Sequence, residues 1–273
     1  MARRLSRQGE RALDAANELV ERAWAETDRD ERRALAEQAL LLSPLCAYAH
    51  GVLAELAGRT TPEAITHWRR AVTVGATALG PAGFREMAAL RSRPAHADAY
   101  CDALGELADA LWETGARAEA IMAMLRGLET DPRDEYGIRY RLLGWFIEEG
   151  RDEEARLILV GSQRDGESTW PWAAALLRFR SHGADENACD LLRDALVTND
   201  NVAPRLLGLD RVPDDLKGEV DSAQAIDAAL VAGALEDAWT HTPGALDWLA
   251  AELPGLMQAI ATADEAEIPP EAP

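Results

Sequence analysis

The sequence is poor in lysine, cysteine and aromatic residues, and each shortage restricts what the protein can be. Lys217 is the only lysine among 28 basic residues, so cationic recognition would depend on arginine, which forms paired hydrogen bonds to carboxylates and phosphates. A genome composition that replaces lysine by arginine throughout is the simpler explanation. Aromatic residues make up 5%, which is low for an all-β sandwich. The three cysteines, Cys46, Cys101 and Cys189, lie in separate apolar runs and are predicted to be free thiols in a reducing compartment.

The chain also lacks the segments and motifs that mark membrane proteins and many enzymes. No apolar run reaches the roughly 18 residues of a membrane span, and the basic N-terminus is not followed by the apolar core of a signal peptide. We therefore predict a cytoplasmic protein with no membrane partner. The sequence has no phosphate-binding loop, nucleophile elbow, dinucleotide fingerprint or histidine pair at helical spacing. We expect no cofactor, metal site or catalytic residue.

Acidic residues and helix-forming residues dominate what remains. The net charge of −20 and the pI of about 4.6 would repel a phosphate backbone, so nucleic acid is not an expected partner. Hydrophobic residues make up 48%, enough for a packed core. Alanine, leucine, glutamate and arginine are abundant and have high helix propensity. The composition predicts an all-α fold.

Three glycines mark an internal repeat. Gly115, Gly150 and Gly183 each separate two apolar runs, and they are 35 and 33 residues apart (150 − 115 and 183 − 150). This period is the length of one helical hairpin repeat. A repeat of this kind buries its apolar face only against its neighbours, and the stack leaves an extended concave surface for binding. We therefore predict a right-handed α-solenoid of stacked helical hairpins.

The repeat and its punctuation divide the chain into five expected segments. Asp28 followed by Glu31, and Thr61 before Pro62, are helix-start signals in a segment of N-terminal hairpins. The expected segments are N-terminal helical hairpins over 1–72, an insertion with one short helix near 84–90 over 73–96, three repeat hairpins over 97–200, an atypical C-terminal helical cap over 201–263, and a disordered tail over 264–273. Within the cap we expect a loop over 204–217 and helices over 222–238 and 244–263.

The hairpin over 97–130 resembles the tetratricopeptide repeat. The residues that carry the resemblance are Leu104, Leu107, Ala108, Leu111, Gly115, Ala120, Met124, Gly127 and Pro132. Leu104, Ala108 and Met124 depart from the usual tryptophan, glycine and aromatic residue. Trp172 and Phe179 of the fifth hairpin keep the tryptophan and one aromatic residue, but Asp200 replaces the closing proline.

Over most of its length the chain also resembles bacterial relatives of the suppressor-of-tumorigenicity seven family. The matching segments are Leu79-Gly80-Pro81 with Phe84-Arg85-Glu86, Arg93-Pro94, Leu107-Ala108-Asp109-Ala110-Leu111-Trp112, Glu119-Ala120-Ile121, Asp131-Pro132, Gly137-Ile138-Arg139-Tyr140, Asn201-Val202-Ala203-Pro204, Leu206-Leu207-Gly208 and Thr242-Pro243-Gly244-Ala245-Leu246-Asp247-Trp248-Leu249. The resemblance implies a fold and a binding role, with no assigned catalytic activity. A cysteine-rich zinc motif of some relatives is missing here.

In tetratricopeptide-like proteins the first helix of each hairpin lines the groove, which points to six candidate peptide-binding residues. They are Asp102, Asp109, Trp112, Glu113, Arg139 and Tyr140. Arg139 and Tyr140 have the chemistry to bind a peptide carboxylate. An internal ion pair of Arg139 with Asp109 or Glu106 is the simpler alternative.

Tryptophans allow two interpretations as well. Trp112, Trp145, Trp170 and Trp172 would form an aromatic patch in the groove or, more simply, part of the core between helices.

Three functions remain open from the sequence. The leading hypothesis is a non-enzymatic scaffold or adaptor whose concave surface binds a protein or peptide. The first alternative is an acidic regulatory decoy or inhibitor that binds a basic partner and releases it in salt. The second is an uncharacterised hydrolase using paired acids such as Asp152 and Glu153, although acids at a helix start already have a structural explanation. The sequence leaves the oligomeric state open.

Overall fold

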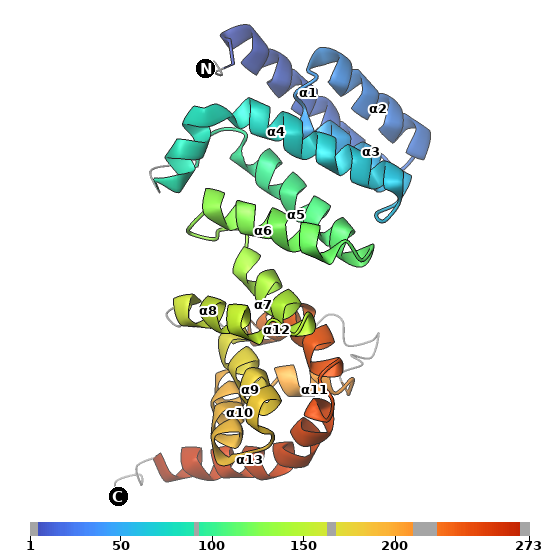
Figure 1. Ribbon diagram of the computed structural model, residues 1–273. Helices are drawn as coiled ribbons and strands as arrows, with labels where there is room; N and C mark the ends of the chain where they lie inside the picture. Colours follow the sequence, from blue (N-terminus) through green and yellow to red (C-terminus); the bar gives the residue numbers. More distant parts are fainter. Residues whose placement is uncertain (1–4, 90–92, 163–167, 210–222, 268–273) are drawn as a thin grey trace, which may run out of the picture. The chain divides into compact units, whose positions relative to one another are not determined.

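The computed structural model of the protein describes residues 5–89, 93–162, 168–209 and 223–267, and these fold into thirteen α-helices without a strand (Figure 1). The chain divides into two compact units, Met1–Ile138 and Arg139–Pro273, which are described separately. The boundary falls inside the segment 97–200. The all-α prediction is confirmed.

Unit 1 is built from three helical pairs. Its helices are α1 (Arg7–Ala25), α2 (Arg29–Leu42), α3 (Ala47–Ala57), α4 (Pro62–Ala88), α5 (Ala97–Glu113) and α6 (Arg117–Thr130). Each helix packs on the next one in the chain, and the first helices of the pairs also contact one another in the order α1, α3, α5. The first helices of the three pairs are therefore neighbours.

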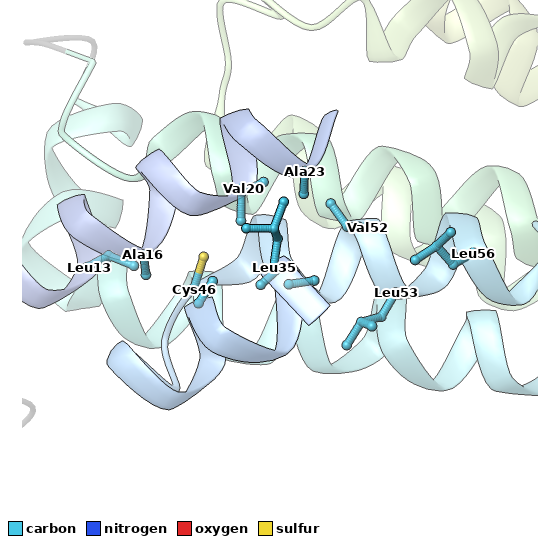
Figure 2. Packing of buried hydrophobic residues seen from close by; sticks show 12 residues of the cluster. Leu13, Ala16, Val20, Ala23, Leu35, Cys46, Val52, Leu53 and Leu56 are labelled. Atoms are coloured by element: carbon cyan, nitrogen blue, oxygen red, sulfur yellow. The ribbon is translucent and has the colours of Figure 1, made fainter. Parts of the chain in front are cut away.

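The core of the first two pairs comes from helical periodicity. Leu13, Ala16, Val20 and Ala23 lie on one stripe of α1 and are buried against apolar residues of α2 and α3, as Figure 2 shows. Burying one leucine of such a stripe contributes about 1.5–3 kcal/mol. The Cys46 thiol in this cluster donates a hydrogen bond to Asn17 Oδ1 at 3.3 Å.

Local signals fix several helix ends as expected. Asp28 accepts hydrogen bonds from the backbone N–H groups of residues 30 and 31, and Thr61 accepts one from Ala64. In a capping box the side chain of Glu31 would accept a hydrogen bond from the Asp28 N–H. Here the Asp28 N–H donates to Glu26 Oε1 at 3.0 Å instead. Gly115, Gly150 and Gly183 have φ values of 82°, 69° and 71°, so these turns require a residue with positive φ, which glycine adopts without strain.

The segment 73–96, which was expected to be an insertion, begins inside a helix, because α4 continues without interruption to Leu79. Gly75 lies inside the helix, where a Cβ atom would be 3.1 Å from Tyr100 Cα. This glycine permits close packing of α4 on α5 rather than ending the helix. The change of direction comes at Gly80, with φ 63° and ψ 170°, followed by Pro81. The short helix expected near 84–90 is the second half of α4.

Unit 2 has shorter and less regular helices. They are α7 (Ile138–Glu148, with Ile138 counted in unit 1), α8 (Asp152–Ser162), α9 (Thr169–His182), α10 (Glu186–Thr198), α11 (Val202–Leu206), α12 (Ala223–Thr240) and α13 (Ala245–Glu267). The two helices expected in the cap correspond to α12 and α13. Helix α11 ends at Leu206 and so occupies the start of the loop that was expected over 204–217. Helix α13 continues to Glu267 and so includes the first residues of the expected tail. The rest of that loop, 210–217, and the tail residues 268–273 lie outside the described residues.

Aromatic residues hold unit 2 together. The Trp172 side chain of α9 meets Trp239 of α12 edge to face, and Trp239 stacks on Trp248 of α13. Phe179 of α9 also stacks on Trp248, with the two ring centroids 4.7 Å apart. Trp170 and Trp172 are buried, so the core interpretation is confirmed for these two. Helix α7 approaches α12 so closely that a Cβ atom on Gly144 would overlap the Ala234 carbonyl oxygen.

Candidate functional site

A row of five carboxylates follows one side of α5. The residues are separated by four, four, three and four positions, which places them on one stripe of a helix. The members of this acidic stripe are Asp98, Asp102, Glu106, Asp109 and Glu113. Leu104, Leu107 and Leu111 occupy other positions of the helix and are buried in the core. The stripe is therefore left for solvent or for a ligand.

The middle of the acidic stripe carries uncompensated negative charge. Burial raises the pKa of Asp102, the Asp98 carboxylate raises it further, and Tyr48 and Arg93 act in the opposite direction. Within the part of the chain that the structure describes, neither Asp102 nor Glu106 forms an ion pair. A cation placed beside these carboxylates would relieve their mutual repulsion.

Arginines of the chain itself bind both ends of the stripe. Arg59 contacts Asp109 Oδ2 at 3.4 Å and Glu113 Oε1 at 3.0 Å. At the other end Arg93 Nε lies 2.5 Å from Asp98 Oδ1, and the Tyr136 hydroxyl donates to the same oxygen at 2.6 Å. The Arg93 guanidinium also lies 4.9 Å from the centre of the Tyr136 ring. The stripe thus already accommodates guanidinium groups, with an aromatic ring beside one of them.

Aromatic side chains connect the stripe to α1 and α3. The Tyr48 hydroxyl of α3 donates to Asp102 Oδ2 at 3.4 Å, and its ring meets Trp24 of α1 edge to face at 5.4 Å. Trp24 is 46% exposed, which is unusual for so large an apolar side chain. We name the surface formed by Trp24, Tyr48, Arg59 and the acidic stripe the α1–α3–α5 face.

Three of the six candidate residues predicted from the sequence lie on this face, namely Asp102, Asp109 and Glu113. Trp112 is on α5 but not in the stripe, and the Arg117 guanidinium lies 4.6 Å from its ring centre. The other two candidates belong to unit 2, where Tyr140 stacks on Trp170 with ring centroids 4.7 Å apart. A binding role for Arg139 and Tyr140, and the alternative ion pair of Arg139, stay predictions.

Sequence reasoning missed the partners of α5 on other helices. Tyr48 of α3 and Arg59 of the turn after α3 contact the stripe, and Trp24 of α1 contacts Tyr48, only because these elements pack beside α5, and no local spacing indicates this. The regular spacing of Asp98 and Glu106 with the three predicted acids was a usable signal for these two residues. The complete stripe was therefore predictable, but its aromatic border was not.

A second pair of side chains that sequence spacing did not connect is formed by His50 and His67. Their Nδ1 atoms are 3.3 Å apart between α3 and α4. The pKa of His50 is lowered to about 4, first by burial and then by His67 and Arg70. Burial also lowers the pKa of His67. Both rings are therefore mostly neutral near pH 7, and in this state one imidazole can donate a hydrogen bond to the other.

In the described part of the chain, no three His, Cys, Asp or Glu side chains are grouped so as to hold a metal ion. None of the described helices is both long enough and apolar enough to cross a membrane. Comparisons with models of known families and with curated proteins find no match. The tetratricopeptide and suppressor-of-tumorigenicity seven resemblances therefore stay predictions from sequence.

Proposed function

We propose that the protein is a non-enzymatic, cytoplasmic scaffold or adaptor that binds a protein or peptide segment on the α1–α3–α5 face. The proposal includes a tetratricopeptide-like, right-handed solenoid. It is supported by the pairing of consecutive helices in unit 1 and by the contacts between α1, α3 and α5, because the groove of such repeats is lined by the first helices.

The observation that carries the proposal is the acidic stripe beside Trp24 and Tyr48. Tyr48 packs in part against the core of unit 1, whereas the carboxylates and the exposed Trp24 ring combine two chemistries that recognise a cation. Carboxylates form charge-assisted hydrogen bonds with arginine and lysine, and the face of an indole ring attracts the same groups. Arg59 and Arg93 supply this interaction at the ends of the stripe, and the middle offers two more carboxylates.

The partner segment is therefore proposed to be basic. This joins the binding-scaffold hypothesis to its first alternative, an acidic regulator with a basic partner, since both use the same surface. The net charge of −20 would also speed the approach of a basic partner and disfavour nucleic acid.

Two labelled peptides test the proposal by fluorescence anisotropy. One is a ten-residue peptide of alternating arginine and serine, and the other has glutamate in place of arginine. We expect the arginine peptide to bind with a dissociation constant of about 10–100 μM and the glutamate peptide to show no saturable binding. Raising the salt to about 0.5 M shortens the Debye length to about 4–5 Å and should weaken the charged part of the interaction.

The matched variants place the binding on the stripe. Asp102→Asn with Glu106→Gln removes two charges without breaking an ion pair and should weaken binding of the arginine peptide about tenfold. The control, Glu186→Gln with Asp194→Asn, removes two exposed carboxylates from α10, neither of which is in an ion pair in the described part of the chain, and should leave binding within about twofold. Equal losses in both double variants would show that net charge alone attracts the peptide, and the assigned surface would be wrong.

A further inference from the structure

Helix α12 of unit 2 is apolar on two opposite sides. One side is fully buried at Val231, Leu235 and Trp239 and packs on α9, α11 and α13. The other side is a stripe of four exposed residues at positions i, i+3, i+4 and i+7. The members of this α12 stripe are Ile226, Ala229, Leu230 and Gly233. The Ile226 and Leu230 side chains are 53% and 67% exposed, whereas a helix that is apolar all round is normally covered all round.

The exposed part of α12 near the stripe carries no charge. The exposed positions from Ala223 to Gly233 are all uncharged, whereas the exposed side of α1 is mostly charged. Asp227 lies beside the stripe, but it is half-buried and accepts a hydrogen bond from Asn199 Nδ2 at 2.7 Å. In a chain of net charge −20, this is a surface on which a second acidic molecule can approach without direct repulsion.

Gly233 leaves a gap in the stripe that its own unit does not fill. A glycine inside a helix costs about 0.5–1 kcal/mol relative to alanine. At Gly51 and Gly75 the missing side chain permits close packing, because a Cβ atom would lie 3.2 Å and 3.1 Å from an atom of the next helix. At Gly233 a Cβ atom would meet nothing within 4 Å. A side chain from another molecule can therefore enter here.

The α12 stripe fits a reversed copy of itself. Ile226 and Gly233 are equally far from the midpoint between Ala229 and Leu230. In an antiparallel pair of α12 helices with a two-fold axis at this midpoint, Ile226 of each copy is level with Gly233 of the other. The isoleucine then enters the gap, and the two Leu230 side chains meet near the axis. A parallel pair would instead place one Gly233 beside the other and leave the gap empty.

The charges at the end of α12 favour the same arrangement. Glu236 and Asp237 are exposed near the C-terminal end of the helix, where negative charge opposes the helix dipole. In the antiparallel pair Glu236 is level with Ala223 of the second copy, the residue at which α12 begins. The backbone N–H groups of a helix start attract negative charge. The acids of one copy therefore face the positive end of the other α12 and not its acids.

We infer that the α12 stripe is a docking surface for a second copy of this chain, which packs on it as an antiparallel, two-fold symmetric α12 helix. One helix face is smaller than the roughly 800 Å² per partner of a standard stable interface. The dimer is therefore weak, with a dissociation constant of about 100 μM, and dilute solutions contain mostly monomer. This surface is separate from the acidic stripe proposed to bind a basic segment, because that stripe belongs to unit 1.

Sedimentation equilibrium of the full chain between about 5 and 500 μM tests the inference. We expect a monomer–dimer equilibrium that becomes at least threefold tighter when the salt is raised from about 0.05 M to about 0.5 M, because salt screens the repulsion between two acidic copies. The arginine peptide should respond to salt in the opposite direction. A monomer at every concentration in both salts would overturn the inference.

Substitutions in the stripe assign the surface. Leu230→Glu should weaken the dimer at least tenfold. Leu157→Glu is the matched control, because Leu157 of α8 is also exposed, at 73%, and it should leave the dimer within about twofold. Equal losses in the two variants would place the contact elsewhere.

Gly233→Leu separates a specific fit from general apolar attraction. The change adds apolar surface and raises helix propensity, so folding is not at risk, but it fills the gap that receives Ile226. We expect the dimer to weaken at least fivefold. A tighter dimer would show that apolar area alone drives association, and the antiparallel register would be wrong.

Disulfide cross-linking tests the orientation. In a protein that also carries Cys189→Ser, Ile226→Cys is mixed with a size-tagged Gly233→Cys protein and oxidised with copper phenanthroline. The mixed disulfide should form at least fivefold faster than either disulfide between identical chains, and Leu157→Cys with the Gly233→Cys protein gives the rate of random collision. Faster cross-linking between identical chains, or a mixed rate no higher than the random one, would contradict the antiparallel pair.

Discussion

The acidic stripe of unit 1 and the groove between α8 and α9 of unit 2, which is lined by Arg156 and Arg178, both contain arginine–carboxylate ion pairs. On α5 five carboxylates meet arginines only at the two ends, so negative charge remains in the middle. In the groove each lining arginine has its own carboxylate, Glu153 for Arg156 and Asp185 for Arg178. The difference shows that the pairing of individual side chains, and not the net charge of the chain, decides where charge is left for a partner.

The substitution with the largest expected effect, Gly144→Ala, tests whether the two units unfold independently. Gly144→Ala would place a Cβ atom against the Ala234 carbonyl oxygen, and because the obstacle is backbone, α7 and α12 must move apart. We expect a loss of about 3 kcal/mol in unit 2 while unit 1 keeps its melting behaviour in calorimetry. Gly233→Ala, where a Cβ meets nothing within 4 Å, is the control. A single shifted transition would contradict independent units.

Ala120→Leu is the corresponding change in unit 1. Ala120 is fully buried where α6 packs on α5, so a larger side chain should cost about 1–3 kcal/mol through overpacking. Chemical denaturation followed by circular dichroism measures it. The substitution should also weaken binding of the arginine peptide, because α5 shifts. Unchanged binding of the arginine peptide by a destabilised variant would contradict the placement of the binding site on α5.

Unit 1 should be the more acid-sensitive unit because of His50. Its folded pKa of about 4 lies below the ordinary 6.5, so the folded state favours the neutral ring and loses stability as the pH falls from about 6.5 through 4. The charged groups that face the His50–His67 pair are Arg70, Glu63 and Arg33.

We expect the His50 contribution to the free energy of unfolding to fall by about 1–2 kcal/mol between pH 7 and pH 4.5. Denaturant unfolding of the wild type and of His50→Leu at both pH values measures it, since the variant should lack that part of the loss. His241→Leu, which changes an exposed histidine, should behave like the wild type. Equal pH dependence in all three proteins would remove His50 as the cause.

The smallest expected effect concerns Arg139 and Tyr140. If these residues bind a peptide carboxylate, Arg139→Ala with Tyr140→Ala should weaken the arginine peptide with a free C-terminus about two- to threefold and leave its amidated form unchanged. Anisotropy titrations of both peptides provide the comparison. The same loss for both forms would reduce the pair to a structural role, consistent with the stacking of Tyr140 on Trp170.

Features set within a few residues of sequence were predictable. The turn glycines, the caps at Asp28 and Thr61 and the α1 stripe follow from local backbone chemistry and periodicity, and Asp102, Asp109 and Glu113 share one face of α5 for the same reason. Long-range contacts were not predictable. Gly75 indicated a break because nothing local reveals that it faces Tyr100, and Trp24, Tyr48 and Arg59 join the stripe only through packing between helices.

The burial of two thiols has a practical and a chemical consequence. Burial raises the pKa of Cys46, and it raises the pKa of Cys101 to about 12, so almost none of either residue is thiolate at neutral pH. Oxidants and maleimide dyes react with the thiolate, which leaves the half-buried Cys189 of α10 as the cysteine that alkylates first. A single dye attached there lies outside the α1–α3–α5 face and follows the folding of unit 2 alone.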